Sequence, residues 1–276
     1  MPVNAVRFVR KMRGGAQAHL IEADDGGFYV VKFRNNPQHR RILVNEWIAS
    51  VFLRYLGILT PETQIVSLSS EFLRDNPEVS LQFGTKTVSI PPGWHFGSRY
   101  PGHPDRIAVY DFLPDALLQK VENLDHFAGT LVLDKWMGNA DARQSIFLRA
   151  QLKEWNLNKT HPARKGFVAI MIDHGYVFDG PQWTFSDSPL QGLYFRPLVY
   201  RGVRSEESFE PWLSRVSTFP EEVMDEAWRQ IPKEWLDGDE DELELLLTKL
   251  LRRRKNLPAY LRDSAKARTH PFPDWR

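Results

Sequence analysis

Residues 13–33, RGGAQAHLIEADDGGFYVVKF, decide how the fold of this chain is interpreted. Two β-prone runs, residues 18–23 and 28–33, flank the turn Asp25-Gly26-Gly27. Glycine tolerates the positive φ that tight hairpin turns demand, so the pattern predicts a β-hairpin. The chain around this hairpin is therefore expected to be rich in strands.

The pair Gly14-Gly15 lies between a strand-like run, residues 7–12, and the hairpin. Glycines let consecutive backbone amides approach a phosphate, and such amides form an anion-binding concavity. Taken alone, the pair is more typical of an ordinary β-turn. Its meaning depends on the residues that follow it.

Lys32 stands late in the second strand of the hairpin. The next segment, residues 40–57, has apolar residues at helical spacing, contains Glu46, and can end at Gly57. In isolation, Lys32 reads as a surface residue. A strand lysine and a helix glutamate, however, are the two halves of the ion pair that positions lysine on nucleotide phosphates in kinases. Both residues have apolar neighbours, which predicts partial burial, and buried charges need partners.

Asp141 and Asp173 are the second candidate pair. Residues 145–149 and 166–173 read as strands, and an antiparallel hairpin of the two would bring both aspartates to its open end. One carboxylate can orient a hydroxyl nucleophile and accept its proton, and the other can hold magnesium against nucleotide phosphates. The simpler interpretation is that both aspartates are ordinary turn residues, which are common. The order Asp173-His174-Gly175 after an apolar strand resembles the Asp-Phe-Gly metal motif and favours the functional reading.

The remaining segments complete an α+β pattern. Strands are expected at residues 63–68 and 106–112, a short helix at 71–79, a loop with fixed turns at 90–104, a helix over about 117–137, and helices at 209–216, 220–231 and 240–255. This order predicts a β-rich N-terminal part with one prominent helix, residues 1–113. A mainly helical C-terminal part that contains one hairpin, residues 114–276, would follow it.

Composition narrows the classes of function. The 276 residues are 42% hydrophobic and 26% charged, which suits a globular protein. The net charge of +1 disfavours nucleic acid as the main partner, and the basic run Arg252–Lys255 is better explained as complementing a helix dipole. There is no cysteine, no apolar run long enough for a membrane, and no secretory signal at the N-terminus. A cytoplasmic location is expected.

The order glycine turn, Lys32, Glu46, Asp141, Asp173 is that of a kinase-like phosphotransferase. From about Arg13 to Tyr200 the chain resembles the HipA-like kinases, most closely the shorter branch that lacks the N-terminal extension of the full toxin. The resemblance is carried by residues 11–33, LVNEWIAS (43–50), FGSRYPG (96–102), VYDFLP (109–114), LDKWMGNADARQSIF (133–147) and MIDHGYVF (171–178).

The resemblance implies a single domain with the two-lobed protein-kinase-like fold, in which residues 1–113 form the N-lobe with one αC-like helix and residues 114–276 the C-lobe with the catalytic hairpin. It also implies ATP and Mg²⁺ as cofactors and a serine or threonine of a protein as the phosphate acceptor. It implies nucleotide contacts from Gly14, Gly15, Ala16 and Gln17 in a phosphate loop, from Lys32, and from the hinge Tyr110-Asp111-Phe112. Asp141 would be the catalytic aspartate, supported by Lys32 and Glu46, and Asp173 a metal ligand. An antitoxin-like protein partner is conceivable from the same resemblance, as is a relation to toxin–antitoxin systems.

Two positions depart from the family pattern. HipA toxins carry a serine just ahead of the phosphate-loop glycine, whose autophosphorylation shuts the kinase down, and Met12 occupies the matching position here. A kinase catalytic loop also supplies a metal-binding asparagine five residues after its aspartate, and this position is Ile146. The amide oxygen of Gln144 or Asn139 could replace it as a metal ligand.

Two alternative functions and the roles of two residues stay open. Ile146 motivates a pseudokinase or scaffold that binds nucleotide without turnover. A small-molecule phosphotransferase is the other alternative, because substrate choice resides in loops that the fold does not determine. Arg143 could contact the transferred phosphate or pair with an internal carboxylate. For His174, a structural role is favoured over that of a general base.

Overall fold

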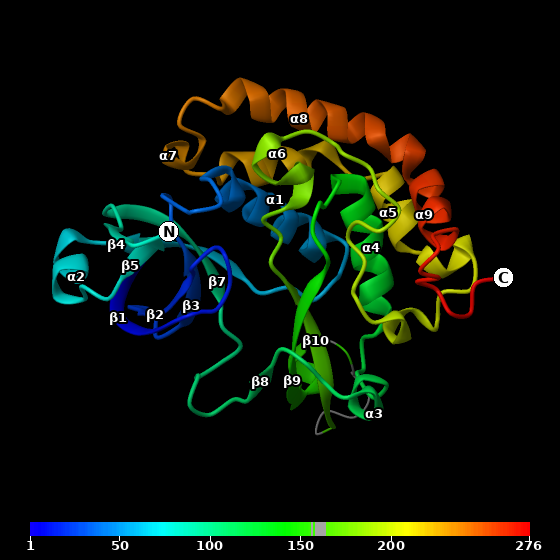
Figure 1. Cartoon of the computed structure of the whole chain (residues 1–276), viewed down its shortest axis with the longest axis horizontal. Coiled ribbons are helices and arrows are strands. Elements are labelled where there is room, and N and C mark those ends of the chain that lie inside the picture. Colours follow the sequence, from blue (N-terminus) through cyan, green and yellow to red (C-terminus); the bar gives the residue numbers. More distant parts are fainter. Residues whose placement is uncertain (156, 158–163) are drawn as a thin grey trace.

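The computed structural model describes residues 1–155, 157 and 164–276. Near the N-terminus, strands close into a barrel in the order β1-β2-β3-β7-β4 (Figure 1). They span Val3–Lys11 (β1), His19–Ala23 (β2), Phe28–Lys32 (β3), Gly93–Arg99 (β7) and Thr63–Leu68 (β4). The predicted hairpin is confirmed, because β2 and β3 pair antiparallel around Gly26, whose φ is 73°.

Strand β7 corrects the expected loop over residues 90–104. Residues 93–99 pair with both β3 and β4 in the barrel. A Cβ on Gly97 would lie 2.5 Å from Val66 Cγ2 and 3.2 Å from the Gln64 carbonyl oxygen. This glycine therefore permits a close approach between strands rather than a turn. The expected short helix is present as α2, Ser70–Asp75, and is followed by a small ribbon that was not predicted, β5 (Ser80–Phe83) with β6 (Lys86–Ser89).

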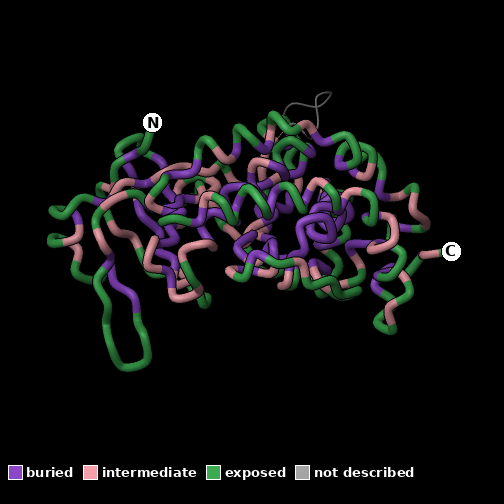
Figure 2. The backbone as a smooth tube through the Cα atoms, turned by 90° about the horizontal axis from the view of Figure 1, so that it is seen from above, coloured by how far each residue is buried: buried purple, intermediate pink, exposed green. Residues whose placement is uncertain are grey.

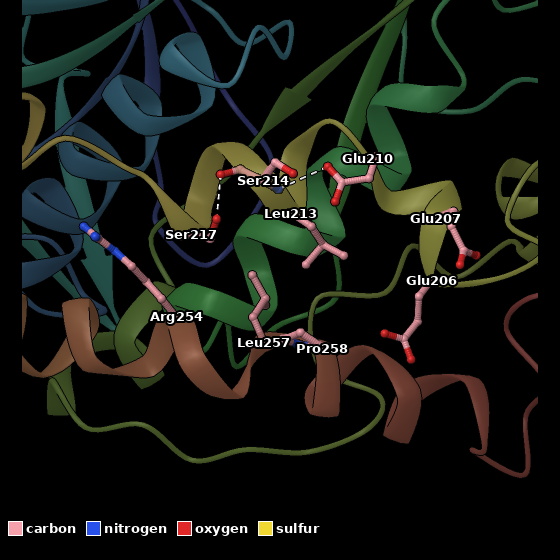
Figure 3. Close-up of a pocket in the computed structure, with 9 residues that line it drawn as sticks. All are labelled: Glu206, Glu207, Glu210, Leu213, Ser214, Ser217, Arg254, Leu257 and Pro258. Atoms are coloured by element: carbon pink, nitrogen blue, oxygen red, sulfur yellow. Dashed lines mark hydrogen bonds between the residues drawn. The ribbon is translucent and has the colours of Figure 1, made fainter.

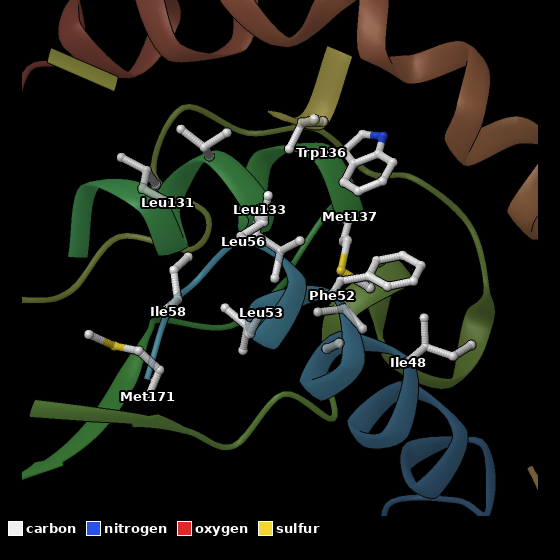
Figure 4. Close-up of a cluster of buried hydrophobic side chains, with 14 of the residues drawn as sticks. Ile48, Phe52, Leu53, Leu56, Ile58, Leu131, Leu133, Trp136, Met137 and Met171 are labelled. Carbon is white, nitrogen blue, oxygen red and sulfur yellow. The ribbon is translucent and has the colours of Figure 1, made fainter. Parts of the chain in front are cut away.

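Helix α1, Arg41–Tyr55, confirms the helix expected at residues 40–57 and ends ahead of Gly57, whose φ is 75°. It is buried on all sides, as a helix with apolar residues around its whole circumference must be. Phe52 of α1 stacks on Trp136 of α4 (Asp125–Met137) with ring centroids 5.6 Å apart (Figure 4). Helices α1 and α4 thus belong to one large apolar core, whereas the barrel has a separate core inside it.

The second sheet has the order β10-β9-β8. Strands β9 (Gln144–Gln151) and β10 (Lys165–Ile172) form the expected antiparallel hairpin, in which Gln144 faces Ile172. The strand expected at 106–112 is reduced to β8, Val109–Tyr110, because this edge segment pairs with β9 alone. The helix expected over 117–137 divides into α3, Asp115–Leu118, and α4.

The remaining helices pack mainly on α4 and α1, and η1 packs on the β9–β10 hairpin. They are η1 (Leu152–Trp155), η2 (Val177–Gln182), η3 (Pro197–Tyr200), η4 (Glu206–Phe209), α5 (Trp212–Ser217), α6 (Glu221–Arg229), α7 (Lys233–Leu236), α8 (Glu240–Arg253), η5 (Arg254–Asn256) and α9 (Leu257–Ala265). Buried positions run through the centre of the molecule (Figure 2). None of the helices in the described ranges is long and apolar enough to cross a membrane.

The chain from α6 to α8 passes over α1 toward the barrel (Figure 1). Asp239 accepts hydrogen bonds from Arg40 at 2.9 Å and from Arg41 at 2.6 and 2.7 Å. The indole of Trp235 is fully buried, and its Nε1 donates to the Trp94 carbonyl oxygen on β7 at 2.9 Å. Helix α1 is therefore packed from the C-terminal side as well as from the barrel, and the division of the chain at residue 113 remains a prediction.

The basic run at the end of α8 is engaged internally. The Arg253 guanidinium donates to both carboxylate oxygens of Asp187 and to the carbonyl oxygens of Lys135 and Trp136 at the end of α4. Arg254 donates to the carbonyl oxygen of Phe219. Two of the four basic residues are thus held by contacts within the chain, whereas Arg252 and Lys255 are exposed, and the expectation that nucleic acid is not a partner remains a prediction.

Candidate active site

Lys32 is the centre of the candidate site. It is the last residue of β3 and is buried, and its Nζ donates to Glu46 Oε1 on α1 and, at 2.7 Å, to Asp173 Oδ1 after β10. Glu46 is 3% exposed. The structure thus brings Lys32 and Glu46 together as expected from the sequence, and it adds Asp173 to the same ion-pair network.

Lys32 stabilises both carboxylates of this network, although burial raises the pKa of Glu46. Burial alone would lower the pKa of Lys32, but the carboxylates of Asp173 and Glu46 outweigh burial and raise it. The Lys32 ammonium in turn lowers the pKa of Asp173 to about 2, against the opposing effect of burial. Lys32 is therefore cationic and Asp173 anionic at neutral pH. The Asp173 side chain retains 36% exposure, so it reaches solvent at the edge of the network.

Asp141 lies on the loop that follows α4. Gly138 ends the helix in the left-handed region, with a φ of 63°. Asn139 is buried, donates from Nδ2 to Asp134 Oδ1 at 3.0 Å, and accepts from the backbone amide of Asp141 at 3.1 Å. Asp141 itself is exposed. Asn139 therefore shapes the loop that presents the Asp141 carboxylate to solvent.

Gln144 and Ile146 share one face of β9, because side chains alternate along a strand. Gln144 is exposed and faces Ile172, the residue before Asp173. Ile146 packs against the small apolar cluster of Leu148, Leu152, Val168 and Ile170. The oxygen-rich set of the Asp173 carboxylate and the Gln144 amide suits a hard cation such as Mg²⁺. Asn139 fits less well, because its amide oxygen already accepts the Asp141 amide.

Of the two roles considered for Arg143, the structure shows the pairing with an internal carboxylate, that of Asp134. The Nε of Arg143 donates to Asp134 Oδ2 at 2.9 Å, its second terminal nitrogen to Asp134 Oδ1, and its first to the Ile172 carbonyl oxygen at 3.0 Å. Both partners are fully buried. The sequence reasoning missed Asp134, although an aspartate inside the apolar helical run LVLDKW requires a buried partner.

His174 joins this group as a neutral side chain. Nδ1 accepts from Arg143 at 2.7 Å, so Nε2 carries the proton and donates to Thr60 Oγ1 at 3.0 Å. The Thr60 hydroxyl then donates to the Met171 carbonyl oxygen at 3.0 Å. Burial, followed by the Arg143 charge, holds the pKa of His174 well below its usual range. These contacts agree with the structural role favoured for His174 and connect the α1–β4 segment to the loop of Asp141.

The stability of the fold is expected to fall on acidification because of His174. Its folded-state pKa lies below the unfolded value of about 6.5, so the unfolded chain takes up the proton first. The stability that the neutral His174 side chain contributes is fully present above about pH 6.5 and is lost as the pH falls below it. The free energy of unfolding then decreases with a limiting slope of about 1.4 kcal/mol per pH unit. Urea unfolding between about pH 7.5 and 5.5 should show a shallower slope for His174→Gln than for the wild type. Identical slopes would contradict the assignment.

The predicted phosphate loop connects β1 and β2. Gly14 has a φ of 118°, and Gln17 a φ of 49°. The Gln17 amide exchanges two hydrogen bonds of 2.7 Å with the backbone of Gln82, so its side chain is held by the β5–β6 ribbon. Gly15 and Ala16 lie between Gly14 and Gln17. A Cβ on Gly15 would lie 3.0 Å from Gln38 Nε2, so this glycine closely approaches the Gln38 side chain.

The predicted hinge, Tyr110-Asp111-Phe112, is exposed at and after β8. The guanidinium of Arg196 lies over the Phe112 ring, 4.5 Å from its centroid. Gly192, shortly before Arg196 in the chain, contacts the Asp141 loop. Its backbone amide donates to the Asp141 carbonyl oxygen at 3.1 Å.

Two hollows lie away from these residues. One, of about 380 Å³, is lined by Glu206, Glu207, Glu210, Leu213, Ser214, Ser217, Arg254, Leu257 and Pro258 (Figure 3). The other, of about 870 Å³, lies beside the α1–β4 connection and reaches Ile170. Lys32, Asp141 and Asp173 line neither hollow, so the candidate site is identified by its charges and contacts.

Comparisons with known proteins identify the family of this chain and show proteins of similar fold. A family model described as HipA-like kinase matches residues 5–264. The structure of hydra Fam20 with sugar superposes with a TM-score of 0.55 at 13% identity, covering 96% of this chain and 86% of that one, which shows a shared fold. The crystal structure of the Golgi casein kinase with Mn/ADP bound gives a TM-score of 0.48 at 13% identity, covering 97% and 73%. A search of curated protein sequences found no significant match.

Proposed function

Because the chain belongs to the HipA-like kinase family, we propose that it is an ATP-dependent protein kinase that transfers the γ-phosphate of ATP to a serine or threonine hydroxyl. Family membership supports phosphoryl transfer in general. The observation that carries the proposal is the simultaneous contact of Lys32 with Glu46 and Asp173. A lysine held in this way is the group that kinases place on nucleotide phosphates.

In this proposal, α1 acts as the αC helix and Glu46 fixes the direction of Lys32. Asp173 and Gln144 would hold Mg²⁺, which when bound neutralises charge on the phosphates. Gly14 to Gln17 would cover the phosphates with backbone amides, and Tyr110 to Phe112 would border the adenine. Asp141 would orient the acceptor hydroxyl and take its proton.

A protein acceptor is supported by the surface next to Asp141. Leu190 and Phe195 are 49% and 65% exposed, and the segment between them is hydrogen-bonded to the loop of Asp141 and Arg143. Exposed apolar side chains beside a reactive group suit contact with another protein.

The Asp141→Asn variant tests the assignment. Transfer of phosphate from radiolabelled ATP to lysate proteins is expected to fall about 10²–10⁴-fold, because the amide cannot accept the hydroxyl proton. ATP affinity, measured by calorimetry, should stay unchanged. Asp105→Asn is the matched control, since the Asp105 side chain is 84% exposed and outside the site. Unchanged transfer in Asp141→Asn would contradict the catalytic role.

Nucleotide binding without turnover is a second candidate function, favoured by Ile146. That side chain packs into an apolar cluster where kinases place a metal-binding asparagine. Thermal stabilisation by ATP with Mg²⁺, combined with no ATP consumption across many candidate substrates, would favour this scaffold function over the kinase.

A further inference from the structure

Asn45, next to Glu46 on α1, directs the hydrogen bonds of its side-chain amide to the segment behind Asp173. Its side chain is fully buried. Nδ2 lies 2.7 Å from the carbonyl oxygen of Gly175 and 3.0 Å from those of Val177 and Gly180. Oδ1 accepts from Trp183 Nε1 at 2.8 Å. One amide thus binds four points of a single segment.

The segment needs such support because its backbone is irregular. Asp173, Phe178, Asp179 and Trp183 have φ values of 59°, 61°, 61° and 53°, in the left-handed region that non-glycine residues rarely adopt. Buried carbonyl groups that no regular element satisfies must find other donors. Asn45 supplies those donors from the neighbouring helix.

Gly175 gives independent evidence that this segment is built against α1. A Cβ at this position would lie 2.5 Å from Ile42 Cγ2 and 3.5 Å from Glu46 Oε1. The backbone therefore touches the helix directly, at the turn that carries Glu46. Farther along, Arg41 donates to the Pro181 carbonyl oxygen at 3.2 Å and lies 4.2 Å from the Trp183 ring centroid.

We propose that Asn45 is a positioning residue for the metal-binding loop: it ties the segment behind Asp173 to α1, so that Asp173 and Glu46 reach Lys32 as one preassembled unit. The inference rests on the proposed function, because it concerns the carboxylate assigned to Mg²⁺. It adds a role for a residue that contacts neither nucleotide nor metal. Without Asn45, the buried carbonyl groups of Gly175, Val177 and Gly180 would lose this donor, and the remaining contacts of Gly175 and Arg41 would hold the segment to α1 less firmly.

The test compares wild type with Asn45→Asp, which keeps the shape but turns oxygen atoms toward three carbonyl groups. The affinity for a non-hydrolysable ATP analogue is measured by calorimetry with Mg²⁺ and with EDTA. The wild type should bind more tightly with Mg²⁺, and Asn45→Asp should lose about 10–100-fold of affinity with Mg²⁺ while its affinity in EDTA stays unchanged. Hydrogen exchange of residues 174–183 in the metal-free protein should accelerate in the variant.

Asn123→Asp is the matched control. Asn123 is also buried and exchanges hydrogen bonds with the backbone of Ala169, far along β10 from Asp173. A merely structural role for Asn45 would make both variants alike, with the Mg²⁺ effect retained. If Asn45→Asp does not fold, Asn45→Ser replaces it, because serine removes the amide donors to the segment and introduces no charge.

The outcomes separate the two proposals. A retained Mg²⁺ effect and unchanged exchange in Asn45→Asp or Asn45→Ser, with normal binding in the wild type, would overturn the role of Asn45 alone. A wild-type chain that binds no nucleotide would overturn the proposed function and this inference with it. Loss of the Mg²⁺ effect in the Asn45 variant but not in Asn123→Asp would establish the positioning role.

Discussion

Lys32→Met is expected to abolish phosphate transfer and to destabilise the protein. Methionine keeps the length of the side chain but leaves Glu46, 3% exposed, without its cation. Removing one partner of a buried ion pair costs about 3–5 kcal/mol, because the other charge stays buried. Transfer should fall by at least about 10³-fold, since the lysine stabilises charge on the phosphates during transfer.

A double variant separates the two effects. Lys32→Met with Glu46→Gln removes both charges of the buried pair and should recover much of the stability while transfer stays abolished. Urea unfolding and transfer from radiolabelled ATP are measured on the same samples. Lys86→Met, on the exposed strand β6, is the control and should change stability by less than about 0.5 kcal/mol. A stable, active Lys32→Met protein would contradict the ion-pair network as the centre of the site.

Arg143→Met is expected to be the most destabilising change in the Asp141 loop. The variant leaves the Asp134 carboxylate fully buried inside α4 without its cation, at a cost of about 3–5 kcal/mol. It also removes the donors to His174 and to the Ile172 carbonyl oxygen. Transfer should fall together with stability, because the loops of Asp141 and Asp173 lose their shared support.

Arg149→Met provides the comparison, because Arg149 lies exposed on β9, the strand that begins directly after Arg143. It should change the free energy of unfolding by less than about 0.5 kcal/mol. Adding Asp134→Asn to Arg143→Met should restore much of the stability but not transfer. The amide carries no buried charge and can still accept from Asn139, whereas the contacts of Arg143 with His174 and Ile172 remain absent. Recovery of transfer in that double variant would show that Arg143 acts through stability alone.

Local patterns were enough to predict the main elements near the site. The Asp-Gly turn and the alternating run around Lys32 predicted the β2–β3 hairpin, and the periodicity around Glu46 predicted α1. Two strands after Asp141 predicted the β9–β10 hairpin. In each case the deciding signal lies within about 20 residues, which is the range over which turn chemistry and side-chain periodicity act.

Other features depend on partners far along the chain. From the sequence alone, Gly97 is predicted to lie in a loop. Its role in a strand becomes clear only from its close approach to Val66 and Gln64. Asn45 reads as an ordinary polar residue in a helix, because its four partners lie at least 130 residues away. The pairing of Asp134 with Arg143 spans only nine residues, and the apolar neighbours of Asp134 already indicated a buried partner.

The passage of residues 234–239 over α1 has a consequence for synthesis of the protein. A nascent chain that has released β3 and α1 still lacks Trp235 and Asp239, which pack against Trp94 and bind Arg40 and Arg41. Because folding during translation proceeds from the N-terminus, α1 acquires its full set of neighbours only after the C-terminal helices leave the ribosome. The ion pairs around Lys32 thus become fully supported late, and an incomplete translation product is expected to remain inactive.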